Sequence, residues 1–177
     1  MEDPEGLADW AMLHVPSVMR EDTIWRLPGY RYALYLGDLA QLEDAPRVRR
    51  DYRTRRHLGQ LLSAVGGISA NIAEGYGRTT GPDRAKFFEY AESSAREARD
   101  WFFKVRHALE PTIALARIEL LTRIMKILTT AIIRERADPK SRARRAVTPR
   151  EITPGRTAPV RPPPPSSDEH QRPAAGG

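Results

Sequence analysis

Two short polar motifs contain the residue types that acid–base catalysis uses. Asn71 and Glu74 lie three positions apart, and so do Ser94 and Glu97. On helices each pair spans one turn, so all four side chains would meet where the two helices pack together. Two carboxylates with polar neighbours are the groups that a general acid and a general base require. We favour a structural role instead, in which Glu74 forms a charge-assisted bond with Arg78 and fixes the turn that follows.

Residues for other kinds of catalytic or cofactor site are scattered or missing. The chain has no cysteine, which excludes disulfides and thiolate metal sites, and its four histidines have no ligand spacing. Gly75 and Gly77 do not form a dinucleotide-binding loop, because that motif needs another glycine where Thr80 stands and a strand before it. We therefore expect a non-enzymatic protein with no metal and no cofactor.

Basic residues are concentrated in two stretches of the sequence. The chain carries a net charge of +6, and residues 137–177 contribute +4 of it through eight basic and four acidic side chains. Arginine forks onto phosphate and stacks on rings, so clustered arginines with an aromatic neighbour, here Tyr52, suit nucleic acid. The alternative is that they only solvate a helix face. The candidate nucleic-acid-binding residues are Arg47, Arg49, Arg50, Arg53, Arg55 and Arg56 in the first stretch and Arg142, Arg144 and Arg145 in the second.

The pattern of apolar residues predicts four helices. Apolar side chains recur every three or four positions within residues 28–44, 50–75, 81–109 and 112–136, and Pro46 is expected to end the first of these helices. No stretch alternates apolar and polar residues as a strand would. The chain is therefore predicted to be all-α, and the short loops favour an antiparallel up-down four-helix bundle.

Glycine and threonine positions predict how the second and third helices are joined. The second helix should end at Gly75 in the left-handed conformation, and Gly77 allows a further bend. Thr80 followed by Asp83 resembles a capping box that starts the next helix. The adjacent glycines Gly66–Gly67 weaken a helix, so we expect a bend or a close helix approach there.

Composition divides the chain into three parts. Residues 1–22 form an N-terminal segment with a short amphipathic helix, and residues 23–137 form the bundle. Residues 138–177 are rich in proline and arginine and have almost no large apolar side chains, so we expect a disordered tail. With no signal-peptide pattern and no apolar run long enough to cross a bilayer, the expected location is the cytoplasm, without a membrane partner.

Residues 71–97 resemble the signature of a known family, which reads N-I-A-E-G-x-G-R, a turn, and then F-x-x-x-A-x-[GS]-S-x-x-E. The chain has N-I-A-E-G-Y-G-R from Asn71 and the second motif from Phe87, without a gap. It is identified by this resemblance as a member of the 23S rRNA-intervening sequence protein family, and is similar to the accessory proteins of diversity-generating retroelements. The signature residues, to which we assign a structural role, are Asn71, Glu74, Gly75, Gly77, Arg78, Ser94 and Glu97.

The resemblance implies an assembly and partners as well as a fold. Family members look like four-helix bundles that associate into a homopentamer, and the retroelement accessory proteins bind nucleic acid and a reverse transcriptase. Leu62 and Ser63 stand where the family commonly has two basic residues. The arginines of residues 47–56 would have to replace that basic pair.

Two functions are consistent with these patterns. The first is a non-enzymatic oligomeric scaffold that binds RNA or DNA through its arginine-rich surfaces. The alternative is a protein–protein interaction module, for example a reverse transcriptase accessory protein, without affinity for nucleic acid, in which Pro162 to Pro165 recruit a partner. Binding that weakens steeply with salt would distinguish the first from the second, because phosphate contacts release counterions.

Overall fold

The computed structural model of the chain describes residues 3–137, and these residues form an all-α structure without strands. The predicted tail, with Arg142, Arg144 and Arg145, lies outside the described residues. No helix in the described range is long and apolar enough to cross a membrane. The α-helices are α1 (Leu7–His14), α2 (Ser17–Glu21), α3 (Pro28–Asp38), α4 (Ala45–Arg50), α5 (Leu58–Tyr76), α6 (Gly81–Val105) and α7 (Pro111–Ala137).

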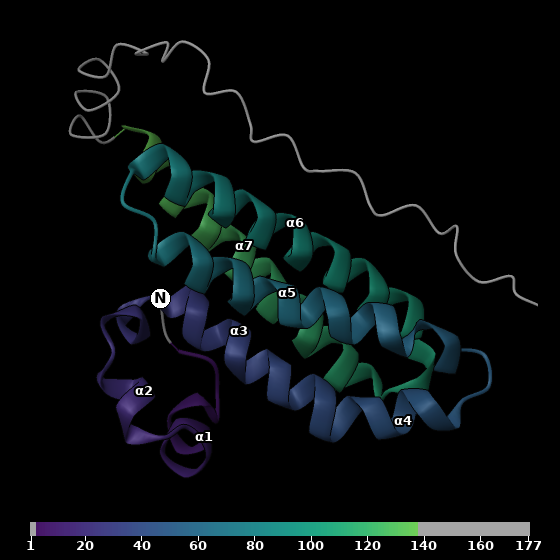
Figure 1. The fold of residues 1–177 in the computed structure, drawn as a ribbon. Helices are drawn as coiled ribbons and strands as arrows, with labels where there is room; N and C mark the ends of the chain where they lie inside the picture. Colours follow the sequence, from purple (N-terminus) through teal and green to yellow (C-terminus); the bar gives the residue numbers. More distant parts are fainter. Residues whose placement is uncertain (1–2, 138–177) are drawn as a thin grey trace, which may run out of the picture.

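The helices pack around one core, in which α6 contacts both α5 and α7, and α3 also contacts α5 and α7 (Figure 1). The predicted apolar stripes line this core, and the alanines of α6 allow its neighbours to approach closely. The largest side chains that are fully buried are Tyr32, Leu36, Val48, Leu61, Val65, Ile68, Ile72, Phe102, Val105, Leu121 and Ile124.

The first helical segment of the core is longer than predicted. A π-helical turn, Leu39–Asp44, joins α3 to α4, so the chain stays helical past Pro46 as far as Arg50. Pro46 lies in the first turn of α4, where the missing proline N–H is tolerated, and the wide π turn before it relieves the clash with the preceding carbonyls. The prediction that Pro46 ends the helix was therefore wrong. The next helix begins at Leu58 and not near residue 50.

Gly75 has a different role from the one predicted. α5 continues to Tyr76, and Gly6 is the one described residue with a positive φ, so Gly75 does not adopt the left-handed conformation. A Cβ at Gly75 would lie 2.9 Å from Cβ of Phe87 and 3.0 Å from Cε1 of Phe88. The glycine is therefore needed for the close approach of α5 to α6.

The other predictions around the α5–α6 pair are confirmed in part. A Cβ at Gly67 would lie 3.0 Å from Oγ of Ser94, which shows the expected close helix approach, whereas Gly66 faces open space. Thr80 caps α6 by accepting a hydrogen bond of 3.3 Å from the backbone N–H of Asp83. The predicted helices 81–109 and 112–136 correspond to α6 followed by a 3₁₀ turn, Arg106–Ala108, and to α7.

The N-terminal segment contains α1 and α2 and packs along α3 (Figure 1). Leu7 is buried in the core, and the indole N–H of Trp10 donates to the Asp38 carboxylate at 2.8 Å. The hydroxyl of Tyr35 donates to the backbone carbonyl of Glu5 at 3.1 Å. These contacts hold residues 3–14 against α3.

Candidate nucleic-acid interface

The six arginines of the first basic stretch are all exposed, with Arg47, Arg49 and Arg50 on α4 and the other three on the connection from α4 to α5. The sequence predicted a helix over residues 50–75 that begins within this stretch. That helix does not begin there, because α4 ends at Arg50 and residues 51–54 form a turn before the 3₁₀ segment Arg55–His57. The arginines therefore cover the outside of α4 and of the tight connection that follows it.

Buried side chains hold this connection in place. Val48 is fully buried, and Thr54, also buried, donates its hydroxyl to the Val48 carbonyl at 3.0 Å. The Asp51 carboxylate accepts from the backbone N–H of Arg53 at 2.9 Å and from its guanidinium at 2.8 Å. These bonds from Arg53 lower the pKa of Asp51 to about 2. Arg53 is thus the one arginine of the stretch whose charge is paired within the described chain.

The remaining arginines of the stretch form no ion pair with a carboxylate in the part of the chain that the structure describes. Arg49, Arg50 and Arg55 make neither a hydrogen bond nor an ion pair there. Arg47 donates to a backbone carbonyl, and Arg56 to the ring of its neighbouring histidine. Five positive charges are therefore available to an external anion on one short segment.

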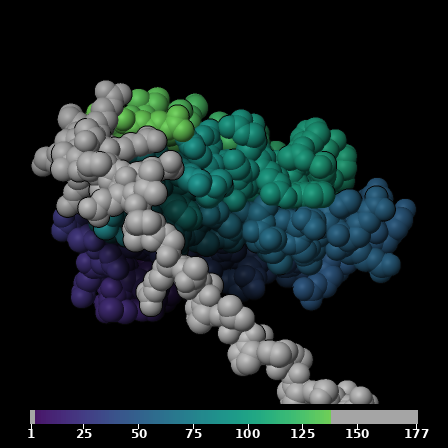
Figure 2. All heavy atoms as spheres, turned by 45° about the horizontal axis from the view of Figure 1, so that its top comes forward, coloured from purple at the N-terminus to yellow at the C-terminus, as the bar shows by residue number. Residues whose placement is uncertain are grey.

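The end of α6 brings further basic and aromatic residues to the same end of the molecule (Figures 1 and 2). The rings of His57 and Trp101 stack with centroids 5.3 Å apart, which joins the α4–α5 connection to α6. Lys104 lies 4.2 Å from the centre of the Trp101 ring, and Arg106 lies 3.9 Å from the centre of the Phe103 ring. We name this surface, formed by residues 47–57 and 101–107, the arginine end.

Sequence reasoning missed the contribution of residues 101–107 to this surface. The apolar stripe of the helix accounted for Trp101, Phe102 and Val105 as core residues. Phe103 falls off that stripe and is exposed, which was the available signal for a surface role. The position of the stretch beside residues 47–57 depends on the packing of α5 on α6, which spacing within one helix cannot give.

The signature residues are brought together only in part. Asn71 and Ser94 both lie beside Gly67, and the Asn71 amide donates to the Gly67 carbonyl at 2.7 Å. The two carboxylates are exposed and have different partners. Glu74 pairs with Arg78 four residues later, as expected, and Glu97 accepts from the Trp101 indole at 3.2 Å. The guanidinium of Arg78 also lies over the Phe87 ring, so this pair borders the α5–α6 turn.

A buried ionic cluster between the π turn and α7 was not predicted at all. Asp44 is fully buried, and the guanidinium of Arg117 donates to it at 2.9 Å and to the more exposed Glu43 at 2.8 Å. Burial raises the pKa of Asp44, and the hydrogen bond and charge of Arg117 oppose that rise. Since the chain offers no sequence motif for this contact, its residues could not be paired without the fold.

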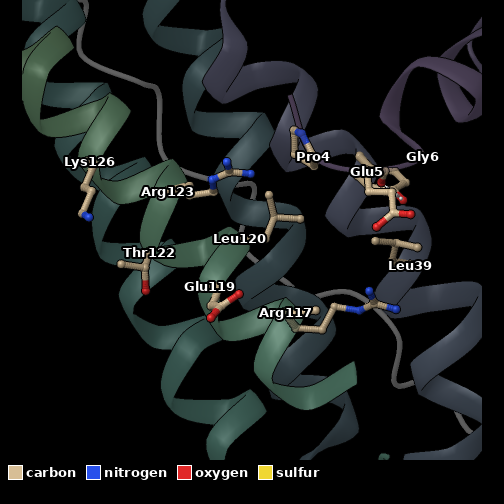
Figure 3. Close-up of a pocket in the computed structure, with 12 residues that line it drawn as sticks. Pro4, Glu5, Gly6, Leu39, Arg117, Glu119, Leu120, Thr122, Arg123 and Lys126 are labelled. Atoms are coloured by element: carbon tan, nitrogen blue, oxygen red, sulfur yellow. Dashed lines mark hydrogen bonds between the residues drawn. The ribbon is translucent and has the colours of Figure 1, made fainter. Parts of the chain in front are cut away.

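A groove of about 880 Å³ lies next to this cluster, between α3 and α7. Figure 3 shows Arg117 reaching from α7 toward Leu39. Residues 4–6 of the N-terminal segment lie on the same side of the groove as Leu39, opposite α7. Arg117 is already bound by two carboxylates, and charges of both signs line the groove. It therefore lacks the excess of positive charge that the arginine end has. Its charged lining residues are Glu5, Arg117, Glu119, Arg123 and Lys126.

No group of three or more metal-ligating side chains occurs among residues 3–137. In comparisons with known proteins, a sequence model described as 23S rRNA-intervening sequence protein matches residues 49–146, which is more than half of the chain. The match covers α5, α6, the described α7 and five of the six arginines of the first basic stretch, all but Arg47. No curated protein matches, and no solved structure matches. The chain belongs to the 23S rRNA-intervening sequence protein family.

Proposed function

We propose that the protein is a non-enzymatic oligomeric scaffold of the cytoplasm that binds nucleic acid through the arginine end. The observation that carries the proposal is that Arg49, Arg50 and Arg55 are exposed and have no partner within the described chain. The scaffold is an antiparallel up-down four-helix bundle in which α3, the π turn and α4 together count as the first helix.

The physical argument rests on where the charges are held. An arginine whose charge is already neutralised gains little from a phosphate, whereas an unpaired guanidinium replaces loosely bound counterions. The connection is anchored by Val48 and Thr54, so the arginines are presented from a fixed backbone. The nearby Asp51 carboxylate is occupied by Arg53 and competes little for the other guanidinium groups.

Oligomerisation would strengthen such binding without new contacts. A ring of identical subunits, as the family resemblance implies, repeats the arginine end once per subunit. A long nucleic acid that contacts several subunits then binds with avidity, because each further contact is intramolecular. We therefore propose a homopentamer as the binding species, with light scattering as the measurement of its size.

The test is charge reversal of the unpaired arginines in the full chain. The triple variant Arg49→Glu, Arg50→Glu and Arg55→Glu should keep its helical circular dichroism, since all three side chains are exposed and unbonded. Its affinity for RNA and DNA, measured by fluorescence anisotropy over a series of salt concentrations, should fall. The slope of log K against log salt should flatten by roughly 0.7–0.9 for each phosphate contact that is lost.

A matched control reverses three other exposed basic residues that form no ion pair within residues 3–137 and lie away from the arginine end, Arg26, Lys86 and Lys126. The net charge changes equally in both variants, so long-range electrostatics are matched. Equal loss in both variants would mean that binding follows net charge and not this surface. Wild-type protein that binds neither RNA nor DNA at low salt would contradict the proposal and leave a protein–protein interaction module, such as a reverse transcriptase partner, as the function.

A further inference from the structure

The arginine end exposes two aromatic rings that the protein itself does not bury. Tyr52 is 77% exposed on the α4–α5 connection, and Phe103 is 54% exposed on α6. Each has a guanidinium nearby, since Arg53 lies 6.0 Å from the centre of the Tyr52 ring and Arg106 lies 3.9 Å from that of Phe103. Exposed rings next to cations are the groups on which unpaired bases stack.

Phe103 also borders a shallow groove of about 550 Å³ on the surface of α6 and α7. Arg96 and Arg99 line this groove together with Phe103 and Ile118, and Asp100 is the one acidic residue in its lining. Asp100 forms an ion pair with Lys104, so its charge is partly offset. The groove therefore combines an apolar ring with the guanidinium groups of Arg99, one turn away along α6, and of Arg96, two turns away and ion-paired with Glu92.

We infer that the arginine end binds single-stranded rather than double-stranded nucleic acid, with unpaired bases stacking on Phe103 and Tyr52. This inference rests on the proposed function, because the arginines supply the phosphate contacts. In a duplex the bases are already stacked on one another and their faces are closed to side chains. In a single strand the faces are free, and stacking tolerates any base because every base has a π face.

The experiment compares the wild type with Tyr52→Ala, Phe103→Ala and Phe103→Leu in the full chain. The probes are a single-stranded oligouridylate, its deoxy counterpart, a duplex of the same length, and a single strand with abasic sites. Each alanine variant should lose at least about fivefold in affinity for the single strands, because base–aromatic stacking contributes roughly 1 kcal/mol or more per base. Affinity for the duplex and the abasic strand should not change, and the salt slope should stay the same.

Phe103→Leu keeps an apolar side chain against the helix but removes the π face. A loss of affinity in this variant is therefore due to the missing ring and not to unfolding. Tyr90→Ala is the matched control, because Tyr90 is an exposed ring on the same helix with Lys86 nearby, far from the arginine end. Its affinity for every probe should equal that of the wild type.

Two results would overturn the inference in different ways. Aromatic variants that bind the single strand as well as the wild type, or that lose affinity equally for the duplex, would refute stacking, while salt-dependent binding would leave the proposed function in place. Wild-type protein that binds none of the probes would refute both. If the wild type binds both single strands, the difference in affinity between the ribose and deoxyribose strands measures how much the 2′-hydroxyl contributes to binding.

Discussion

Replacing Gly75 with alanine should destabilise the protein, although the same change usually stabilises a helix. The new Cβ would lie 2.9 Å from Cβ of Phe87 and 3.0 Å from the Phe88 ring. Carbon atoms prefer separations of about 3.5–4.0 Å, and Cβ of Phe87 is fixed to the backbone of α6 and cannot rotate away. The two helices must therefore separate by several tenths of an ångström or more.

The size of the effect follows from two opposing contributions. Overpacking of a close contact costs typically about 1–3 kcal/mol. The alanine gains up to about 1 kcal/mol of helix propensity in a helix interior, and less in the last turn, where Gly75 lies. We expect the free energy of unfolding to fall by roughly 1–2 kcal/mol, which corresponds to a decrease in Tm of a few degrees at about 2–4 °C per kcal/mol.

Gly66→Ala is the control, because no atom lies within 4 Å of the Cβ that it would introduce. This variant should gain up to about 1 kcal/mol, so the two alanine variants should move in opposite directions from the wild type. Urea unfolding followed by circular dichroism measures both, and the midpoint should shift without a change in the m-value. If Gly75→Ala is stabilised as much as Gly66→Ala, the close approach of α5 and α6 is not what the glycine provides.

Three further changes test other contacts. Arg117→Met should lower the free energy of unfolding by about 3–5 kcal/mol, because it leaves the fully buried Asp44 without a partner. In urea unfolding, adding Asp44→Asn should recover part of this loss. A loss under about 1 kcal/mol for Arg117→Met would contradict the role given to this pair. Glu74→Ala and Arg78→Ala should each lower the free energy of unfolding by only about 0.3–0.5 kcal/mol, since their ion pair is exposed. A thermal melt that shows a much larger loss would mean that the ion pair does more to hold the α5–α6 turn. Because the folded-state pKa of Asp51 is lowered to about 2, its ion pair stabilises the protein above about pH 4, and this contribution is lost as the pH falls toward 2. The difference in stability between wild type and Asp51→Asn should therefore narrow over that range in urea unfolding at a series of pH values, and a constant difference would refute the assignment.

The core could be predicted from the sequence because its signal is local. Ile68, Ala95 and Ile124 lie on apolar stripes with helical spacing, and all three are fully buried. The cap at Thr80 is a local signal of the same kind, since the groups that bond to each other are three residues apart. Such features depend only on residues that are close in the sequence, so they can be predicted without knowing which helices pack together.

The features that the sequence did not give depend on which helices meet. Asp44 and Arg117 are separated by 73 positions, and neither residue type predicts burial. Gly75 was assigned to a helix end on propensity, whereas its role comes from the Phe87 and Phe88 side chains of another helix. The π turn before Pro46 has no reliable sequence signal, so the helix boundary moved by several residues.

The signature and the arginine end therefore have separate parts in the proposed function. Gly75 of the signature and Gly67, which precedes the signature, determine how closely α5 and α6 pack, with Gly67 in the middle of α5 and Gly75 near its end. At the other end of the same helix pair, the stacking of His57 on Trp101 joins residues 47–57 to residues 101–107. A change at the signature that separates the two helices would thus disturb the spacing between the arginines and Phe103 without touching either. The signature would then act on nucleic-acid binding through the packing of α5 on α6 and through the hydrogen bond from the Trp101 indole to Glu97, so its carboxylates need not contact a ligand.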